Sequence, residues 1–584
     1  MTDVKSARAE REPGKRNRAE REPGERNRAE QPLGSRSLAA HSLAAHSLAA
    51  QIKIQGWLVT VLSGALAALV RLTRLDHPHA VVFDETYYVK GAYSMLHFGF
   101  ERSWEGENVN EQFLAGDLSG LSDMPDRWVH PPFGKWLMAQ GMRFDDASGW
   151  GWRMTTAVLG IASVMLLVRI VLRMTRSLPL AGLAGVAMAL DGMGITLSRT
   201  GLLDGMLAFF VLAAFWAVMR DREWLLRRLD NDSRARPCPG VRPCPGVRPW
   251  LILAGVFIGL AGAVKWSGFF AGAAFGLLAW AWGTLLHAQA GRRRWFLAGL
   301  RDGVRAFFNY VPTLAFTYLV SWMPWFLNPH GWDRRWAQTH PDELPLPWAP
   351  DWMNSFIHWH QESASFHTGL NTEHIYESQA WMWLAQLRPV SFYWRSSEDL
   401  PADACLGSDC VAAITSIGNP IVWLLGLISL GLIIYLAFKR DWRAWGILAG
   451  YLGTWAVWLI YVDRTIFQFY AVTTLPFVVL AVIIGIEAVF EDDTPTRQVH
   501  VGTTTYPVIS LRFTAVDPKK RYPQLPLLGT ASAPVRPLTS AGSKAVIIVG
   551  TVITIFGLFW LPLWTAIPVP HWFWQIHMWL PTWI

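Results

Sequence analysis

The sequence is poor in charged residues and cysteine, and it lacks the common phosphate-binding loops. Charged side chains make up 16% of its 584 residues and hydrophobic ones 52%, which excludes a single soluble domain and indicates many membrane spans. No P-loop occurs, and no G-x-G-x-x-G stands between a strand and a helix. ATP and nucleotide sugars are therefore poor candidates for a substrate that donates a group directly. The net charge of +8 is divided among many short segments rather than one stripe, which argues against a nucleic-acid partner.

The four cysteines provide no metal site of recognisable spacing. Cys238 and Cys244 lie in the tandem repeat RPCPGVRPCPGVRP, and no His or Cys pair follows them at zinc spacing. Cys405 and Cys410 lie in a long segment that we place outside the membrane, where a disulfide between them would persist.

Histidines are clustered in the same long segment, but their spacing matches neither H-E-x-x-H nor a facial triad. They are His358, His360, His367 and His374. We expect no metal here and interpret these side chains as hydrogen-bonding groups around a sugar or an acceptor peptide.

Apolar stretches long enough to cross a bilayer recur along most of the chain, which predicts an all-α polytopic membrane protein. About eleven such stretches are present. They lie near 56–75, 154–173, 178–197, 202–219, 250–264, 267–286, 306–327, 419–438, 444–461, 466–489 and 545–567. The 34 tryptophans fit interfacial belts beside these spans, with stacking against a sugar as the alternative.

The segments outside this membrane core differ in composition. Residues 1–50 hold two RAEREPGxRN copies and then SLAAHSLAAHSLAA, a composition that predicts disorder and does not resemble a secretory signal. The core is expected over 51–490, followed by a Pro-rich, loosely ordered loop over 491–544. The last span and a short tail occupy 545–584.

Lys and Arg gather in every second segment between the spans, which places those segments in the cytoplasm. The basic segments hold Arg173 and Arg176, 220–229, 291–295, 439–443 and 518–522. The segments poor in Lys and Arg are 76–153, the turns near 198–201, 265–266 and 462–465, then 328–418 and the tail from 568. The N-terminus is therefore expected in the cytoplasm and the C-terminus outside. The two large external loops, 76–153 and 328–418, suit amphipathic helices on the membrane surface.

The adjacent acids Asp84 and Glu85 follow the first span and are therefore placed at the outer membrane surface. The simplest interpretation, without a function, is a solvated pair at a helix end. However, adjacent carboxylates repel each other and favour a nearby cation. Basic residues recur at the external ends of other spans: Arg153, Arg199, Lys265 and Arg464. Any one of these side chains, taken by itself, could simply extend to the lipid headgroups. Together they suit a lipid phosphate, with a carboxylate as general base for an acceptor hydroxyl.

Two further elements carry polar side chains close to the predicted membrane surface. In VHPPFGK the prolines fix a turn that presents His130 and Lys135, either of which could face a phosphate. In SRTGLLDGM, Asp204 lies just inside a span, five residues after Arg199. A buried acid there either pairs with a cation or belongs to a site.

Seven elements, in order, resemble the actinobacterial protein O-mannosyltransferases. They are FDETYYVK (83–90), VHPPFGK, SRTGLLDG, VKWSG (264–268), RPVSFYW (388–394), GNPIVWL (418–424) and DRTIFQFY (463–470). The resemblance covers about 55–570 and implies a GT-C glycosyltransferase fold of about eleven transmembrane helices. It also implies inverting transfer of mannose from polyprenyl-phosphate-mannose to Ser or Thr of exported proteins, with acceptors met at the Sec translocon of the plasma membrane. No cofactor is then required, because phosphate is already a good leaving group.

The resemblance assigns roles to individual residues. Asp84 would be the general base or would orient the acceptor hydroxyl, and Glu85 would support it. Lipid phosphate would be held by residues matching the family's basic positions: Arg153, Lys265, His130, Lys135 and Arg464. Arg199 and Asp204 would support them. Fungal members often read Phe-His-Tyr where this chain has Gln468-Phe469-Tyr470, so no role is transferred for that histidine. An acid expected next to Lys90 is absent at Gly91.

The 328–418 loop is too short for the MIR domain of eukaryotic members, which leaves acceptor selection to the membrane core. Two alternatives stay open from the sequence. One is a related GT-C transferase that moves another polyprenyl-phosphate sugar to a lipid or wall glycan. The other is a transporter, although no internal symmetry between the halves supports it.

Overall fold

The structure is a computed structural model, and it describes residues 33–127, 129–234, 246–291, 293–401, 403–405, 409–490, 499–501, 504–506 and 538–583. Three predictions fall wholly or largely outside these residues. They concern the first 32 residues of the expected disordered segment, the cysteines Cys238 and Cys244, and most of the loop 491–544.

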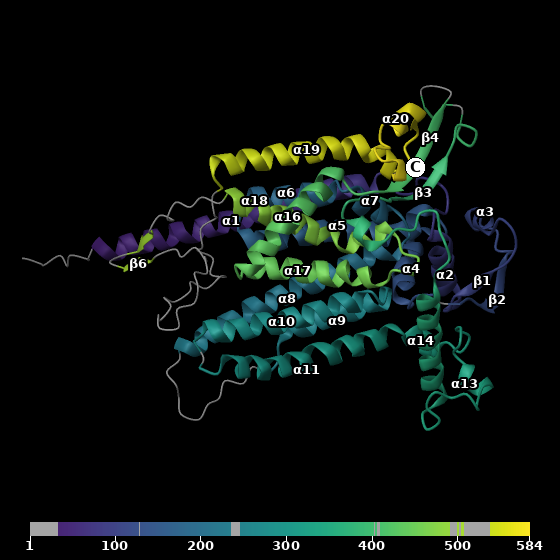
Figure 1. Ribbon diagram of the computed structural model, residues 1–584, viewed down its shortest axis with the longest axis horizontal. Helices are drawn as coiled ribbons and strands as arrows, with labels where there is room; N and C mark the ends of the chain where they lie inside the picture. Colours follow the sequence, from purple (N-terminus) through teal and green to yellow (C-terminus); the bar gives the residue numbers. More distant parts are fainter. Residues whose placement is uncertain are drawn as a thin grey trace, which may run out of the picture.

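Long helices run side by side and form the body of the protein (Figure 1). Within the described residues, six are long and apolar enough to cross a membrane: α1 (Leu33–Leu72) over Lys53–Leu72, α5 (Gly149–Thr175), α8 (Leu203–Arg234) over Leu203–Leu229, α10 (Gly268–Gln289), α16 (Pro420–Phe438) and α19 (Ser540–Trp564). The chain is therefore a multi-pass membrane protein.

Further helices complete the bundle. They are α9 (Pro249–Val264), α11 (Trp295–Ser321), α17 (Trp442–Thr454) with the 3-10 turn η1 (Ala456–Ile460), and α18 (Leu475–Phe490) after the 3-10 turn η2 (Gln468–Thr473). Each of the eleven apolar stretches singled out in the sequence overlaps a helix. The count of eleven membrane crossings itself stays a prediction, because by length and composition six helices qualify, or seven with one bent pair.

The bent pair replaces the single span expected over 178–197. Helix α6 (Leu178–Ala189) and helix α7 (Gly192–Arg199) meet at 56°. Asp191 causes the break, because its carboxylate accepts a hydrogen bond from Gly194 N at 2.9 Å and so caps a new helix. The same carboxylate also accepts from Asn419 N and Trp423 Nε1, each at 2.9 Å, which ties the bend to the start of α16.

Helix α1 begins earlier than the composition suggested. Residues 1–50 were expected to be disordered, but α1 extends back to Leu33 and includes the SLAAH repeats. Alanine and leucine are the strongest helix formers, so this repeat favours a helix even without an apolar face.

Helix α8 lies in the centre of the bundle, whereas α16 lies at its edge. In α8 78% of the apolar window is buried inside the protein, against 22% in α16. The outward apolar side chains of α16 suit lipid rather than protein.

The segments 76–153 and 328–418 lie together with the C-terminal tail at one end of the bundle (Figure 1). The first holds α2 (Glu85–Phe98), α3 (Val109–Leu114), α4 (Phe133–Asp145) and the paired strands β1 (Arg102–Trp104) and β2 (Leu121–Pro125). The second holds α13 (Trp336–Thr339), α14 (Asp351–Gly369), α15 (Ala380–Trp383), β3 (Val390–Arg395) and β4 (Cys410–Ser416), preceded by α12 (Met323–Leu327). Helix α14 runs across the ends of the spans, as expected for a helix on the membrane surface.

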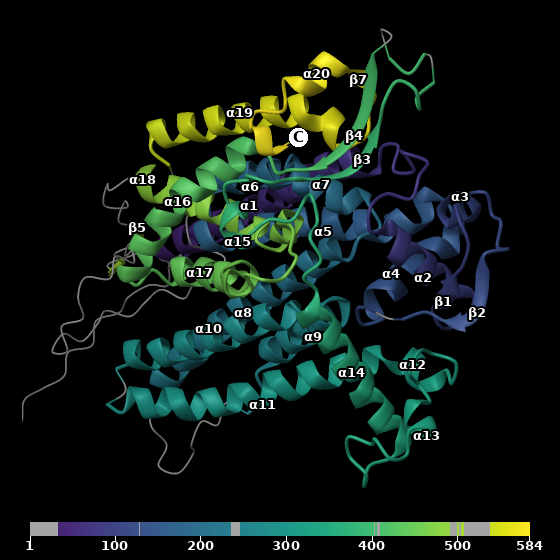
Figure 2. The same cartoon turned by 45° about the vertical axis from the view of Figure 1, so that its right-hand side comes forward.

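A small antiparallel sheet, β3–β4–β7, had no counterpart in the sequence analysis. Strand β3 pairs with β4 from Val390↔Ser416 to Arg395↔Ala412, and β4 pairs with β7 (Val569–Pro570). Cys405 and Cys410 form a disulfide next to β4. The hairpin reaches outward beside α20 (His571–Gln575), and the chain finishes near η3 (Pro581–Trp583) (Figure 2).

Candidate active site

The Asp84-Glu85 pair lies where the turn after α1 leads into α2. Asp84 occupies the N-cap position of α2, but its side chain makes no capping hydrogen bond. Glu85 begins the helix and is completely buried. The two neighbouring carboxylates therefore enter different environments.

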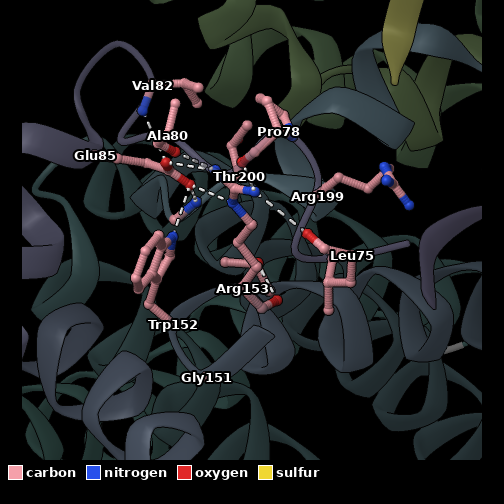
Figure 3. Close-up of polar contacts among 12 residues, drawn as sticks. Leu75, Pro78, Ala80, Val82, Glu85, Gly151, Trp152, Arg153, Arg199 and Thr200 are labelled. Carbon is pink, nitrogen blue, oxygen red and sulfur yellow. Dashed lines mark hydrogen bonds and ion pairs between the residues drawn. The ribbon is translucent and has the colours of Figure 1, made fainter. Parts of the chain in front are cut away.

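The Glu85 carboxylate is held by five hydrogen bonds, which we call the Glu85 clamp (Figure 3). Arg153 binds it through two N–H groups, Nε to Oε1 at 2.8 Å and Nη2 to Oε2 at 2.9 Å. The other donors are Val82 N, Trp152 Nε1 and Gly201 N, at 2.9, 3.2 and 2.7 Å. The clamp thereby joins the turn before α2 to α5 and to the turn before α8.

Arg153 has no N–H group left for a ligand. Besides Glu85, it donates to the carbonyls of Leu75, Pro78 and Ala80. With two bonds to Glu85 these account for the five donors of a guanidinium, and the side chain is fully buried. The lipid-phosphate contact expected for Arg153 is therefore not supported. The residue instead fixes the backbone around residues 75–85.

Arg199 has a similar structural role. Its guanidinium donates to the backbone carbonyls of Val70, Arg71, Thr73 and Arg74. These carbonyls lie in the last turn of α1 and just beyond it, where intrahelical donors run out, so Arg199 closes the C-terminus of α1. Figure 3 shows its guanidinium turned away from Glu85. It is not positioned beside Asp84 as a supporting cation.

Lys135 also lies outside the site. Its Nζ donates to both carboxylate oxygens of Glu101, at 2.7 and 2.6 Å, in a buried ion pair. A Cβ at Gly91 would lie 2.6 Å from Glu101 Oε2, so the missing side chain at residue 91 makes room for this pair. Burial raises the pKa of Glu101 to about 7. The phosphate contact expected for Lys135 is not supported either.

A cavity of about 230 Å³ lies beside Asp84 at the same end of the bundle. Its lining includes Asp204 at the start of α8 and Lys265 at the break between α9 and α10. Lys265 Nζ donates to Asp204 Oδ2 at 2.8 Å and lies 5.0 Å from the centre of the Tyr470 ring. The sequence left open whether Asp204 pairs with a cation or belongs to a site. In the structure Asp204 pairs with Lys265 and also lines the cavity.

Histidine and arginine side chains form another wall of this cavity. The rings of His130 and His367 stack with centroids 5.0 Å apart, and His367 Nε2 contacts Val129 O at 2.8 Å. Arg464 Nε donates to His367 O at 2.8 Å. Among the described residues no carboxylate lies within ion-pair distance of Arg464, so its charge is available to an anionic ligand.

The two wall histidines are uncharged at neutral pH. Burial and the charge of Lys265 hold the pKa of His130 well below its usual range. Burial likewise lowers the pKa of His367 to about 4. The positive charge around the cavity therefore comes from Lys265 and Arg464.

The Asp84 carboxylate makes no hydrogen bond or ion pair within the part of the chain that the structure describes. Burial raises its pKa to about 6, an effect that Lys265 partly offsets and Asp204 adds to. The carboxylate thus lies within electrostatic reach of the Lys265–Asp204 pair. A desolvated acid with a pKa near neutrality and no partner can accept a proton.

Several aromatic cavity residues were missed as site residues in the sequence analysis, although some lie in the quoted motifs. Trp266, Trp458 and Tyr470 line the cavity, together with Ala364, His367 and Thr368 of α14. Aromatic faces beside a cavity that also holds charged groups can stack on a sugar. No spacing rule separates them from the many membrane-facing tryptophans, so the sequence carried no signal for them.

The fold and cavity define a class: a membrane-embedded glycosyltransferase with the GT-C architecture. The structure is similar to that of the S. cerevisiae protein O-mannosyltransferase Pmt1-Pmt2 complex bound to the sugar donor. The TM-score is 0.61 at 14% sequence identity, over 91% of this chain and 92% of that one.

Sequence comparisons give the family. Residues 61–319 match the family model described as dolichyl-phosphate-mannose-protein mannosyltransferase. The chain is 33% identical to the polyprenol-phosphate-mannose--protein mannosyltransferase of Mycobacterium tuberculosis (strain CDC 1551 / Oshkosh), over 74% of this chain and 80% of the relative. It is 30% identical to the enzyme of that name from Mycolicibacterium smegmatis (strain MKD8), over 91% and 93%. The chain belongs to the protein mannosyltransferase family.

Proposed function

We propose that this protein transfers mannose from polyprenyl-phosphate-mannose to Ser or Thr hydroxyls of exported proteins. The relatives of the family carry this donor and a protein acceptor in their names. The observation that carries the proposal in this chain is the unpartnered Asp84 carboxylate beside a cavity that holds Lys265 and Arg464. That combination suits a hydroxyl acceptor on one side and a phosphate on the other.

Asp84 serves as the general base of an inverting transfer. The acceptor oxygen attacks the anomeric carbon of mannose, and its proton passes to the Asp84 carboxylate. The bond between the anomeric carbon and the phosphate oxygen breaks, and polyprenyl phosphate leaves with the electron pair. The pKa of Asp84, about 6, keeps its carboxylate ionised at neutral pH yet basic enough to take the proton.

The leaving phosphate is stabilised by Lys265 and Arg464. Fixed cations in a site shielded from water stabilise developing negative charge without reorganisation. Asp204 orients the Lys265 ammonium through the 2.8 Å hydrogen bond. Because phosphate is a good leaving group, we propose that transfer proceeds without a metal or other cofactor.

The active site faces the outside of the plasma membrane, where a lipid-linked donor and exported chains meet. The concentration of Lys and Arg in every second connecting segment supports this orientation, with a cytoplasmic N-terminus and an external C-terminus. Acceptors then reach the site as they leave the Sec translocon, while membrane lipid surrounds the polyprenyl chain.

The test uses right-side-out vesicles supplied with polyprenyl-phosphate-mannose and a membrane-impermeant Ser/Thr-rich peptide. We expect the wild-type protein to label the peptide, with or without a chelator. Asp84→Asn lowers the rate by about 10²–10⁴ because the base is removed. Its thermal stability is unchanged or higher, because a desolvated charge without a partner is removed.

The matched control is Asp117→Asn, an exposed acid of the same external segment, which leaves the rate unchanged. Transfer by Asp84→Asn at the wild-type rate would remove Asp84 from the mechanism. Labelling of a glycolipid acceptor in place of the peptide would favour the related GT-C transferase, and donor uptake without transfer would favour a transporter.

A further inference from the structure

Phe83, the residue before Asp84, has an unusual backbone conformation. Its φ is +47°, in the left-handed region that non-glycine residues seldom adopt. Such a conformation persists only where surrounding contacts determine it. The contacts that hold Phe83 therefore also decide where the next side chain, that of Asp84, points.

Three phenylalanines surround the Phe83 ring. The Phe392 ring from β3 stacks on it with centroids 4.6 Å apart and an interplanar angle of 5°. Phe469 and Phe467, from the segment leading through η2, approach edge-on at 5.6 and 6.4 Å. We call this group the Phe83 cage. Offset-stacked and edge-to-face pairs of this kind are the favourable aromatic geometries.

The cage residues themselves are fixed by the elements that carry them. Phe392 lies in β3 at the irregularity between Ser391 and Tyr393, both of which pair with β4. Between Phe467 and Phe469, the buried Gln468 accepts from Arg388 N at 3.0 Å and donates to Gln386 Oε1 at 3.0 Å. The Gln468 amide thus anchors the cage segment to the loop that precedes β3.

The Phe83 cage holds the residue before Asp84, and the Glu85 clamp holds the residue after it. Glu85 is held by its five hydrogen bonds, and Phe83 is held by its ring. The Asp84 carboxylate makes no hydrogen bond to the described residues, and only its backbone carbonyl accepts, from Tyr87 N and Tyr88 N in the first turn of α2. A base that must stay unpaired cannot be oriented by its own carboxylate contacts, so its neighbours have to orient it.

We propose that Phe83 is a positioning residue for the transfer reaction: the cage of Phe392, Phe467 and Phe469 holds residue 83 in its left-handed conformation and so aims the Asp84 carboxylate at the acceptor. The inference rests on the proposed function. It assigns a catalytic consequence to an aromatic group that core packing alone would otherwise explain.

The test replaces Phe83 by Leu and, separately, Phe392 by Leu, so that apolar bulk stays while ring stacking is lost. Each variant is expected to lower kcat by about 10–10², the effect of misplacing a reacting group by a fraction of an ångström to an ångström. The KM for polyprenyl-phosphate-mannose stays within about threefold, because the cage does not line the cavity. The combined variant loses no more than about the larger single effect, since both changes break the same contact.

Two controls separate positioning from folding. Trp394→Leu removes another aromatic contact of β3, the Trp394–Trp574 pair with centroids 4.7 Å apart, and leaves kcat unchanged. Adding Phe83→Leu to Asp84→Asn produces no further loss, because the effect acts through Asp84. Thermal unfolding of each variant is compared with that of Trp394→Leu.

Wild-type kcat in both Phe83→Leu and Phe392→Leu would overturn the inference, as would a loss confined to donor KM, which would indicate sugar stacking. A further loss on top of Asp84→Asn would also overturn it. These outcomes differ from failure of the proposed function, in which the wild-type protein itself transfers no mannose.

Discussion

The Glu85 clamp and the cavity beside Asp84 start from neighbouring residues but use charge in opposite ways. In the clamp, a buried carboxylate and the Arg153 guanidinium satisfy each other and the surrounding backbone. Beside the cavity, Asp84 has no partner among the described residues and a pKa raised to about 6. One region uses charge to fix the fold, and the other keeps charge available for a substrate.

The basic residues divide in the same way. Arg153 and Arg199 bind backbone carbonyls and are buried, whereas Lys265 and Arg464 line the cavity. The comparison teaches that a cation at the end of a span can serve either region. What decides its role is whether nearby backbone carbonyls occupy its donors.

The largest expected effect comes from breaking the clamp with Arg153→Met. This change removes the counter-charge and two of the five hydrogen bonds of the buried Glu85 carboxylate, and it removes the Arg153 donors to three carbonyls. Breaking such a buried pair costs about 3–5 kcal/mol in the free energy of unfolding, so little folded protein is expected. Thermal unfolding in detergent measures it, with Arg464→Met as the control that keeps near wild-type stability.

The double variant Glu85→Gln with Arg153→Met recovers part of the loss, because no charge is then buried alone. A stable Arg153→Met protein with weakened donor binding would contradict this assignment and would restore the phosphate contact to Arg153.

A smaller effect is expected from the cavity cations. Lys265→Met is combined with Asp204→Asn so that no lone charge is buried. The donor KM should then rise by about tenfold or more relative to Asp204→Asn alone, since a hydrogen bond to a charged group contributes about 1.5–3 kcal/mol. Arg464→Met should raise it less, because Arg464 is partly exposed. Steady-state kinetics with varied polyprenyl-phosphate-mannose measure both, and an unchanged KM in both would assign the phosphate to other groups.

Much of this organisation could be predicted from the sequence, and the part that could not depends on contacts distant in the chain. Apolar runs predicted the helices, because burial and lipid contact both leave a composition signal. The partners of Arg153 and Arg199 are mainly carbonyls, which every residue carries, so the sequence did not distinguish them from Lys265. The Glu101–Lys135 pair spans 34 positions, and neither residue has a spacing that predicts the other.

Local rules also failed where two long segments met. The strands β3 and β4 were not predicted, because they are short and their pairing depends on the hairpin between them. Phe83 carried no signal at all. Its ring stacks on Phe392, which lies more than three hundred residues later in the chain, so no local pattern indicates its left-handed backbone.

The smallest expected effect, and the one that most sharpens the comparison, is the pH dependence of transfer. Asp84 must be ionised to accept a proton, and its pKa is about 6. The rate should therefore fall about tenfold per pH unit as the pH drops below about 6 and level off above it. The folded-state pKa lies above the ordinary value of 3.8, so ionised Asp84 weakens folding. Its protonation between pH 6 and 4 consequently stabilises the fold while it stops the reaction.

The neighbouring titratable groups allow this profile to be assigned. Burial lowers the pKa of His367 to about 4 and holds the pKa of His130 well below its usual range, so neither ring accounts for an inflection near pH 6. Glu101 has a pKa of about 7 and titrates in the same range, so the profile is repeated in Glu101→Gln with Lys135→Met. The inflection near pH 6 should persist in that variant, because the Glu101–Lys135 pair lies outside the cavity. It should be absent from the residual rate of Asp84→Asn. A profile that is flat between pH 5 and 7.5 in the wild type would show that no proton leaves through Asp84, and the two acids would then differ in structure but not in function.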